Sequence, residues 1–316
     1  MELVSVIITT HNRDWDLSRA IKSVLNQSYS NIEIYVIDDN PSSATEGIIN
    51  QFTSNINYIK SKKKGLPFSR NLGLSLSKGD FVVFLDDDDE LLNDSIAKRK
   101  LVFDQLNEKI KSKTALIYSG CSINLVRENR VTFNMPKIYG DVSNYLKLGH
   151  ISTIPSTFFL NKSVLIKYEI KFDESFSSFI DHDFFMSLAY NKLHVYYVNE
   201  ALTKTYIFPT KKSMVNDINE RKRNIKNFLK KWNNYISDYM NIKVKKNFYR
   251  NYIGNEYSKL IFNSFLSLDI LTAINTYNDL KYFENKTQNL SLHVIKKFVL
   301  KLIRHFTPSF ILRFKK

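Results

Sequence analysis

Cysteine and long apolar runs are both scarce in this 316-residue chain. Cys121 is the single cysteine, so an internal disulfide is excluded, and the composition fits a reducing compartment. No stretch reaches the roughly 18 apolar residues that a membrane-spanning helix requires. The first residues lack the basic segment of a signal peptide, and their apolar run is short. We therefore expect a cytoplasmic protein.

Three glycine-rich nucleotide-binding loops are also missing from the sequence. No G-x-G-x-x-G follows the first predicted strand, which disfavours a dinucleotide-binding protein. No G-x-x-x-x-G-K-[ST] is present, which argues against a P-loop protein. The G-x-G-T-R type of loop of sugar-phosphate nucleotidyltransferases is absent as well. Any nucleotide site in this chain must therefore use other residues.

Positive charge is concentrated in the last third of the chain. Residues 1–209 contain 24 basic and 24 acidic residues, whereas residues 210–316 contain 22 and 7 and carry the whole net charge of +15. Such a surplus suits an anionic partner, such as a membrane, a nucleic acid or an acidic protein. Because Pro209 marks this change, we expect one domain over residues 1–209 and a basic α-helical region over 210–316.

Predicted strands and helices alternate over the first 110 residues. β-branched and apolar runs predict strands at 3–10, 32–37, 56–59 and 81–85, and helical patterns lie between them at 17–25, 42–52 and 68–76. This alternation is typical of an open α/β sheet of parallel strands, which binds ligands beyond the carboxyl ends of its strands. Later segments predict short strands within 114–160, a helix at 181–191 and strands at 195–198 and 202–208.

Five consecutive acids, Asp86 to Glu90, follow the strand at 81–85. They repel one another and suit neither a strand nor a helix interior, but carboxylate oxygens are the ligands that Mg²⁺ and Mn²⁺ prefer. The alternative is a solvated turn that caps the next helix through Asp89 or Asp94. The apolar strand directly before the acids favours the metal site.

Asp38-Asp39 and Arg70 are further candidates for a nucleotide site. An acid at a strand end commonly accepts hydrogen bonds from a nucleotide, and a guanidinium offers a fixed fork of donors. The alternatives are a turn before Asn40-Pro41 and an arginine on a helix surface. Taken alone, neither pattern decides.

Six segments of the chain closely resemble the motifs of family 2 glycosyltransferases, which have the GT-A fold. They occur in the family's order and with its spacing, over roughly residues 3–205. The segments are Val4–Arg13, Ser23–Tyr29, Glu33–Asn40, Arg70–Gly73, Gly79–Asp89 and Phe172–Glu174. The resemblance implies an α/β, GT-A nucleotide-sugar-binding fold with a mostly parallel central sheet, followed by the C-terminal helical region.

The resemblance also implies roles for single residues. Four positions match those that hold the nucleotide base, usually uracil: Thr9, His11, Asp39 and Arg70. Asp86 and Asp87 match the stretch that faces the ribose, and Asp88 matches the carboxylate that binds the metal ion, Mn²⁺ or Mg²⁺.

The family's catalytic base lies in an acidic pair soon after the F-D-E motif. Within 179–185, Ile180-Asp181 stands where the family has Glu-Asp, so the resemblance assigns the base to Asp181. Because the Glu is missing, Asp183 remains a competitor, and residues 169–171 also lack the family's usual Gly. Such a carboxylate takes the proton of the acceptor hydroxyl as that hydroxyl attacks. One base with in-line attack implies inversion at the anomeric carbon, as in the family.

The predicted helix at 295–306 has an apolar stripe flanked by basic residues. The stripe consists of Ile295, Phe298, Val299, Leu302, Ile303 and Phe306. From residue 296 onward there are seven basic residues and no acid. This pattern predicts a helix lying on an anionic membrane surface. Packing on neighbouring helices is the alternative, and no motif of a nucleic-acid-binding module is visible.

These features together predict an inverting, metal-dependent glycosyltransferase. It would move a sugar from a nucleotide-sugar, taken to be a UDP-sugar, to a hydroxyl of a glycan or lipid-linked glycan in cell-surface polysaccharide synthesis. We expect it on the inner face of the cell membrane, bound through the C-terminal helix, with no nucleic acid as partner. A two-carboxylate hydrolase would not need a nucleotide-type sheet. The alternative is a non-catalytic, membrane-associated protein that binds a nucleotide-sugar.

Overall fold

The computed structural model describes residues 1–11, 14–52, 56–144, 154–208, 217–239, 245, 248–266, 269–284 and 294–298. Within these ranges the chain divides into two compact units, of which the first ends at Asn224 and the second begins at Ile225. The division lies inside one helix, α8 (Ile218–Tyr239). The expected boundary after residue 209 lies outside the described residues and stays a prediction.

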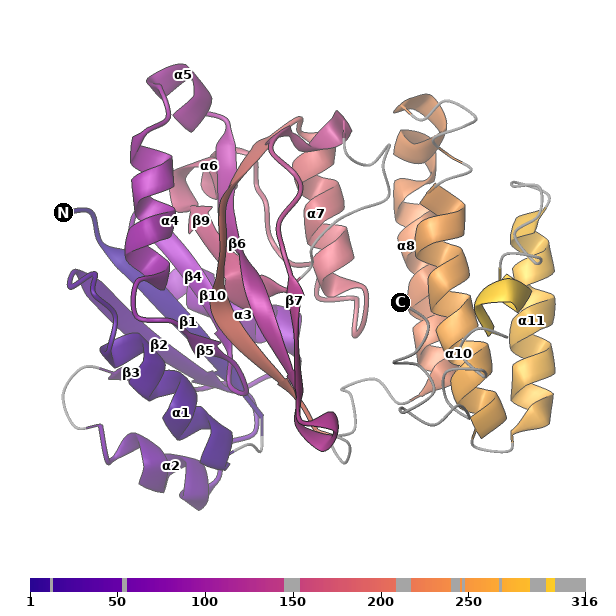
Figure 1. The fold of residues 1–316 in the computed structure, drawn as a ribbon, viewed down its shortest axis with the longest axis horizontal. Helices are drawn as coiled ribbons and strands as arrows, with labels where there is room; N and C mark the ends of the chain where they lie inside the picture. Colours follow the sequence, from indigo (N-terminus) through magenta and orange to yellow (C-terminus); the bar gives the residue numbers. More distant parts are fainter. Residues whose placement is uncertain are drawn as a thin grey trace. The chain divides into compact units, whose positions relative to one another are not determined.

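A ten-stranded sheet forms the centre of the first unit (Figure 1). Its main path is β3-β2-β1-β4-β9-β6-β10-β5, while β7 pairs with β6 and β8 pairs with β10. The four strands from β3 to β4 are parallel, as are β6 and β10, and β9 joins the two groups antiparallel to both neighbours. The strands are β1 (Val4–Thr10), β2 (Ile32–Asp38), β3 (Ile56–Lys60), β4 (Phe81–Asp86), β5 (Glu90–Leu91), β6 (Thr114–Leu125), β7 (Arg130–Asn134), β8 (Gly140–Asp141), β9 (Phe158–Asn161) and β10 (His194–Ile207).

Two predicted stretches differ from the observed strands. The strands expected at 195–198 and 202–208 form the single strand β10, whose register shifts after Val198 and again after Ala201. β6 contains twelve residues, although shorter strands were expected there. Both differences arise because β6 and β10 pair along almost their whole length, and this long-range pairing leaves no local sequence signal.

Helices cover both faces of the sheet. The apolar residues of α1 and α4 pack in one core cluster with Val6 and Ile8 of β1. Ile7 points the opposite way and meets α3, where an added Cβ on Gly73 would lie 2.4 Å from Ile7 Cγ2. Only glycine therefore permits this close approach of α3 to the sheet. The helices of this unit that precede α8 are α1 (Asp14–Leu25), α2 (Ser43–Ile49), α3 (Leu66–Leu76), α4 (Ser95–Asp104), α5 (Glu108–Lys111), α6 (Lys162–Lys167) and α7 (Ile180–Tyr190), with 3₁₀ turns at Val126–Glu128, Val142–Asn144 and Pro155–Thr157.

The second unit is helical, as the sequence predicted. Besides the end of α8 it contains a π-helix (Tyr249–Gly254), α10 (Asn255–Leu266), α11 (Ile270–Glu284) and a helical stretch at 294–298. Its core includes Phe228, Trp232 and Tyr257, all at most 8% exposed. No helix among the described residues is long and apolar enough to cross a membrane.

Candidate active site

The carboxyl ends of β1, β2 and β4 bring the predicted site residues to one rim of the sheet. The register places Thr9 of β1 beside Ile37 of β2 on one side and Asp86 of β4 on the other. His11, Asp39 and the acidic run follow these strands directly. The sheet therefore brings together the three strand ends that the sequence assigned to one site.

Asp39 connects the ends of β1 and β2 to the start of α3. Its Oδ1 lies 2.5 Å from His11 Nδ1, and its Oδ2 accepts a 2.8 Å hydrogen bond from the Gly65 backbone N–H. Asp39 is 6% exposed, whereas His11 is 46% exposed. The buried carboxylate thus orients the imidazole, whose Nε2 edge remains available to a ligand. Asp38 has a different role, because its carboxylate accepts hydrogen bonds from the Tyr58 hydroxyl and the Asn40 N–H.

Arg70 links two of the predicted site carboxylates. Its Nη2 lies 2.9 Å from Asp86 Oδ1, and its Nη1 lies 2.9 Å from Asp181 Oδ1. The side chain is 1% exposed, and its guanidinium carbon lies 5.2 Å from the centre of the Phe172 ring. Burial lowers the pKa of Arg70, but the two carboxylates raise it by more, so the guanidinium stays charged. The sequence placed Arg70 at a nucleotide base, and the additional role visible here is to fix Asp86 relative to Asp181.

Asp181 lies in the first turn of α7 and has a perturbed pKa. Its pKa is raised to about 6, because the effects of burial and of the negative charge of Asp86 together exceed the lowering by Arg70. Its side chain is nevertheless 28% exposed, so solvent or a substrate can reach it. A carboxylate with these properties is suited to accept a proton near neutral pH. Asp183, the competitor, is 1% exposed.

The acidic run forms a turn in which each aspartate has different surroundings. Asp87 is 4% exposed and accepts a 2.7 Å hydrogen bond from the Thr10 hydroxyl. Asp89 is 6% exposed and accepts a 2.5 Å hydrogen bond from Ser156 Oγ. Burial raises the pKa of Asp89 well above its ordinary value, and the neighbouring carboxylates add to this effect. The half-buried Asp86 and Asp88 are therefore the members of the run that lie open to a ligand.

Three residues that the sequence did not single out hold this turn in place. Ser156 Oγ accepts a hydrogen bond from the Asp86 N–H at 3.1 Å while it donates to Asp89. On the other side, Arg19 Nη2 donates to the Asp88 carbonyl oxygen at 2.8 Å. Thr10, bonded to Asp87, is the third. Only Thr10 carried a signal, because it is the last residue of a predicted strand.

The acidic turn suits a divalent cation that takes most of its ligands from a bound substrate and few from the protein. No group of three metal-binding side chains occurs within the described residues. Asp88 is half-buried, and Asp86 is 32% exposed with one oxygen engaged by Arg70. Mg²⁺ is typically bound by one or two carboxylates together with substrate phosphates, and these two side chains suit that arrangement.

A family comparison agrees with this geometry. The family model described as "Glycosyl transferase family 2" matches residues 5–169, which are more than half of the chain. The chain belongs to glycosyl transferase family 2.

Two curated glycosyltransferases are similar to part of the chain. GalNAc(5)-diNAcBac-PP-undecaprenol beta-1,3-glucosyltransferase of Campylobacter jejuni is 36% identical over 128 residues, which are 39% of each chain. UDP-Glc:alpha-D-GlcNAc-diphosphoundecaprenol beta-1,3-glucosyltransferase WfaP of Escherichia coli is 39% identical over 101 residues, which are 31% of this chain and 40% of that relative. The matches thus span about two fifths of each relative's length.

Solved structures show the same fold over nearly the whole chain. The structure of S. aureus TarS 1-349 in complex with UDP-GlcNAc superposes with a TM-score of 0.66 and 17% identity. The match covers 97% of this chain and 93% of that one. The expected GT-A fold with a C-terminal helical region is therefore confirmed.

Proposed function

We propose that the protein is an inverting, metal-dependent glycosyltransferase that uses a UDP-sugar. The observation that carries the proposal is the Arg70 bridge. Arg70 holds Asp181, a carboxylate suited to proton abstraction, beside Asp86. Asp86 lies at the rim formed by the carboxyl ends of the parallel strands, where such sheets bind ligands. Family membership and the fold shared with a UDP-GlcNAc complex support the same reading.

The donor's nucleotide is assigned to the ends of β1, β2 and β4. Thr9, His11 and Asp39 would face the base, with Arg70 behind them, and Asp86 would face the ribose. Asp87, which the resemblance also assigns to the ribose, is buried and bonded to Thr10, so it would hold this strand end in place beside the ribose. Asp39 already orients the His11 ring, so this part of the site needs little rearrangement on binding. Asp88 would hold Mn²⁺ or Mg²⁺ against the diphosphate, where the ion offsets the negative charge of the leaving group.

Asp181 is assigned the role of general base. Its carboxylate would take the proton of the acceptor hydroxyl while the hydroxyl oxygen bonds to the anomeric carbon and the bond to the nucleoside diphosphate breaks. Attack from the side opposite the leaving group inverts the anomeric configuration. Arg70 keeps the carboxylate oriented, because its buried guanidinium holds one oxygen of the partly exposed Asp181 in a 2.9 Å ion pair.

A lipid-linked glycan in cell-surface polysaccharide synthesis is the acceptor that we infer. Both curated relatives described above carry diphosphoundecaprenol acceptors in their names. Such an acceptor requires the enzyme at the inner face of the membrane, and the basic C-terminal helix would contribute to binding there. In the described part of that helix, the Phe298 ring lies 5.6 Å from the Phe265 ring. This one residue of the apolar stripe therefore packs on a neighbouring helix, and the membrane contact would fall to the rest of the stripe and to the basic residues.

Turnover of a panel of UDP-sugars with Mn²⁺ tests the proposal. UDP release from one sugar, accelerated by a glycan-diphosphate-lipid acceptor, is the expected result. Thermal stabilisation by a UDP-sugar without any UDP release would instead support the non-catalytic nucleotide-sugar-binding protein.

A further inference from the structure

The strands β10, β6 and β7 form a ribbon with one amphipathic face. The register places Lys204 opposite Ser122 and Ser122 opposite Phe133. In the neighbouring row, Tyr206 lies opposite Asn124, which lies opposite Val131. Directly opposed residues point to the same side of a sheet, so all six share one face. We call it the ribbon face.

The outer edge of the ribbon face is apolar and exposed. Phe133 is 65% exposed and Val131 is 51% exposed, and Val126, in the turn before β7, is 45% exposed. Within the described sheet, β7 pairs only with β6, so it forms an edge. Single exposed apolar residues are ordinary, but Phe133 and Val131 are neighbours on one face of an edge strand, and this pairing indicates an interaction site.

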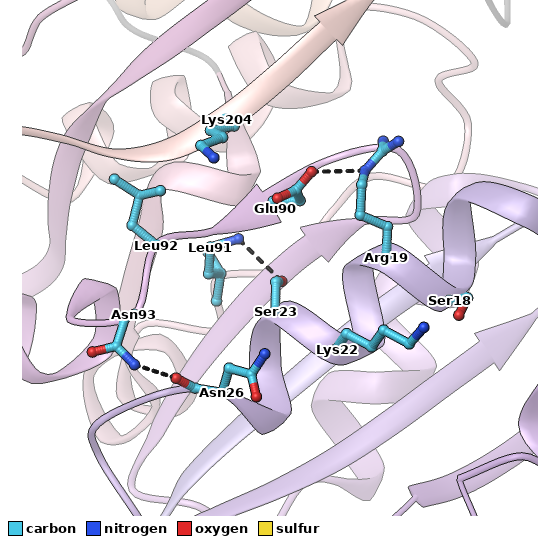
Figure 2. A pocket seen from close by; sticks show the side chains of 10 residues that line it. All are labelled: Ser18, Arg19, Lys22, Ser23, Asn26, Glu90, Leu91, Leu92, Asn93 and Lys204. Carbon is cyan, nitrogen blue, oxygen red and sulfur yellow. Dashed lines mark hydrogen bonds and ion pairs between the residues drawn. The ribbon is translucent and has the colours of Figure 1, made fainter.

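The inner border of the ribbon face is a basic groove. A cavity of about 530 Å³ lies between α1 and β5, with Lys204 on one side and Lys22 on the other (Figure 2). Its single acid, Glu90, lies 2.9 Å from Arg19 Nε and accepts a 2.6 Å hydrogen bond from the Tyr206 hydroxyl. Lys22 and Lys204 form no ion pair with any described residue. Glu90 lies opposite Lys204 in the pairing of β5 with β10. The described lining thus holds three cations, Arg19, Lys22 and Lys204, against one acid, and the groove carries a net positive charge.

We propose that the ribbon face docks on an anionic phospholipid bilayer. Phe133 and Val131 insert at the boundary between headgroups and acyl chains, while Lys22 and Lys204 meet headgroup phosphates. Arg127, exposed in the same hairpin turn and without an ion pair among the described residues, adds a third cation. An apolar edge beside a net positive groove complements a surface whose outer layer is anionic and whose inner layer is apolar. This surface is distinct from the C-terminal helix, and its binding needs neither donor nor acceptor.

Vesicle sedimentation of the full chain tests the electrostatic half of this proposal. We expect binding to vesicles of phosphatidylglycerol and phosphatidylcholine, and little binding to phosphatidylcholine alone. The double variant Lys22→Gln/Lys204→Gln should bind the anionic vesicles roughly 25-fold more weakly, about fivefold for each cation removed. Lys109→Gln, which removes an exposed cation on α5, is the matched control and should bind as the wild type does. Equal binding by the double variant and the control overturns the proposal.

Insertion of the apolar edge is tested with tryptophan and brominated acyl chains. The Phe133→Trp variant should show fluorescence quenching on anionic vesicles of brominated lipid beyond that of the wild type. Ile166→Trp on α6, at a residue that is also 65% exposed, should not. Equal quenching of the two variants contradicts insertion at β7. If the Phe133→Ser substitution dissociates an oligomer and leaves vesicle binding unchanged, the face is instead an interface between copies of this chain.

Discussion

Arg70 Nη1 and Asp181 Oδ1 lie 2.9 Å apart although 111 residues separate them in the sequence. This contact joins α3 to the first turn of α7, and the second arm of the same guanidinium holds Asp86 at the end of β4. One buried cation thus sets the distance between the proposed base and the strand end that we assign to the donor.

The first prediction concerns the identity of the base. Asp181→Asn should lower turnover roughly 100-fold or more while the affinity for the UDP-sugar changes little, because only proton transfer is lost. Asp183→Asn is the matched control on the same helix and should retain far more activity if it folds. The opposite ranking of the two variants would assign the base to Asp183.

The pH dependence follows from the raised pKa of Asp181. The base must be ionised, so kcat/KM should rise with pH through an apparent pKa of about 6 and then level off. Arg70 lowers this pKa, so Arg70→Lys, which weakens the paired contact, should move the acid limb to higher pH. A wild-type profile that is flat down to pH ~4 would exclude Asp181 as the titrating base.

Adjacent aspartates in the acidic turn should respond differently to the same substitution. Asp88→Asn should abolish transfer and weaken nucleotide binding in Mn²⁺, and EDTA should have the same effect on the wild type. Asp89→Asn should be tolerated, because the raised pKa favours a neutral carboxyl that an amide resembles. Full activity in EDTA would contradict the metal-dependent mechanism.

Ser156→Ala should loosen the turn. It removes the hydroxyl between the Asp86 N–H and the buried Asp89 carboxyl and leaves both without that partner. The loss should reduce the free energy of unfolding by about 1–3 kcal/mol and should also weaken donor binding. Ser163→Ala on α6, which removes a hydroxyl remote from the turn, is the control in thermal unfolding and donor titration. Identical behaviour of both variants would deny Ser156 a positioning role.

The sequence predicted the rim but not its internal contacts. Parallel strands must end at the same edge, so His11, Asp39 and Asp86 could be placed together from the strand pattern alone. The pairing of Arg70 with Asp181 depends on how α3 and α7 pack, and no local pattern encodes it. The same holds for Ser156, which reaches the turn from 70 residues away. The fold around the acidic turn likewise decides that Asp87 and Asp89, rather than Asp86 and Asp88, are the buried aspartates.

The anomeric configuration of the product tests the central claim most directly. Once the UDP-sugar panel has identified an α-linked donor that is turned over, proton NMR of the product formed on a glycan-diphosphate-lipid acceptor reports the new linkage. The account predicts a β-linkage whose formation is lost in Asp181→Asn. An α-linked product, or a β-linked product formed equally fast by Asp181→Asn, would contradict inversion with Asp181 as the base.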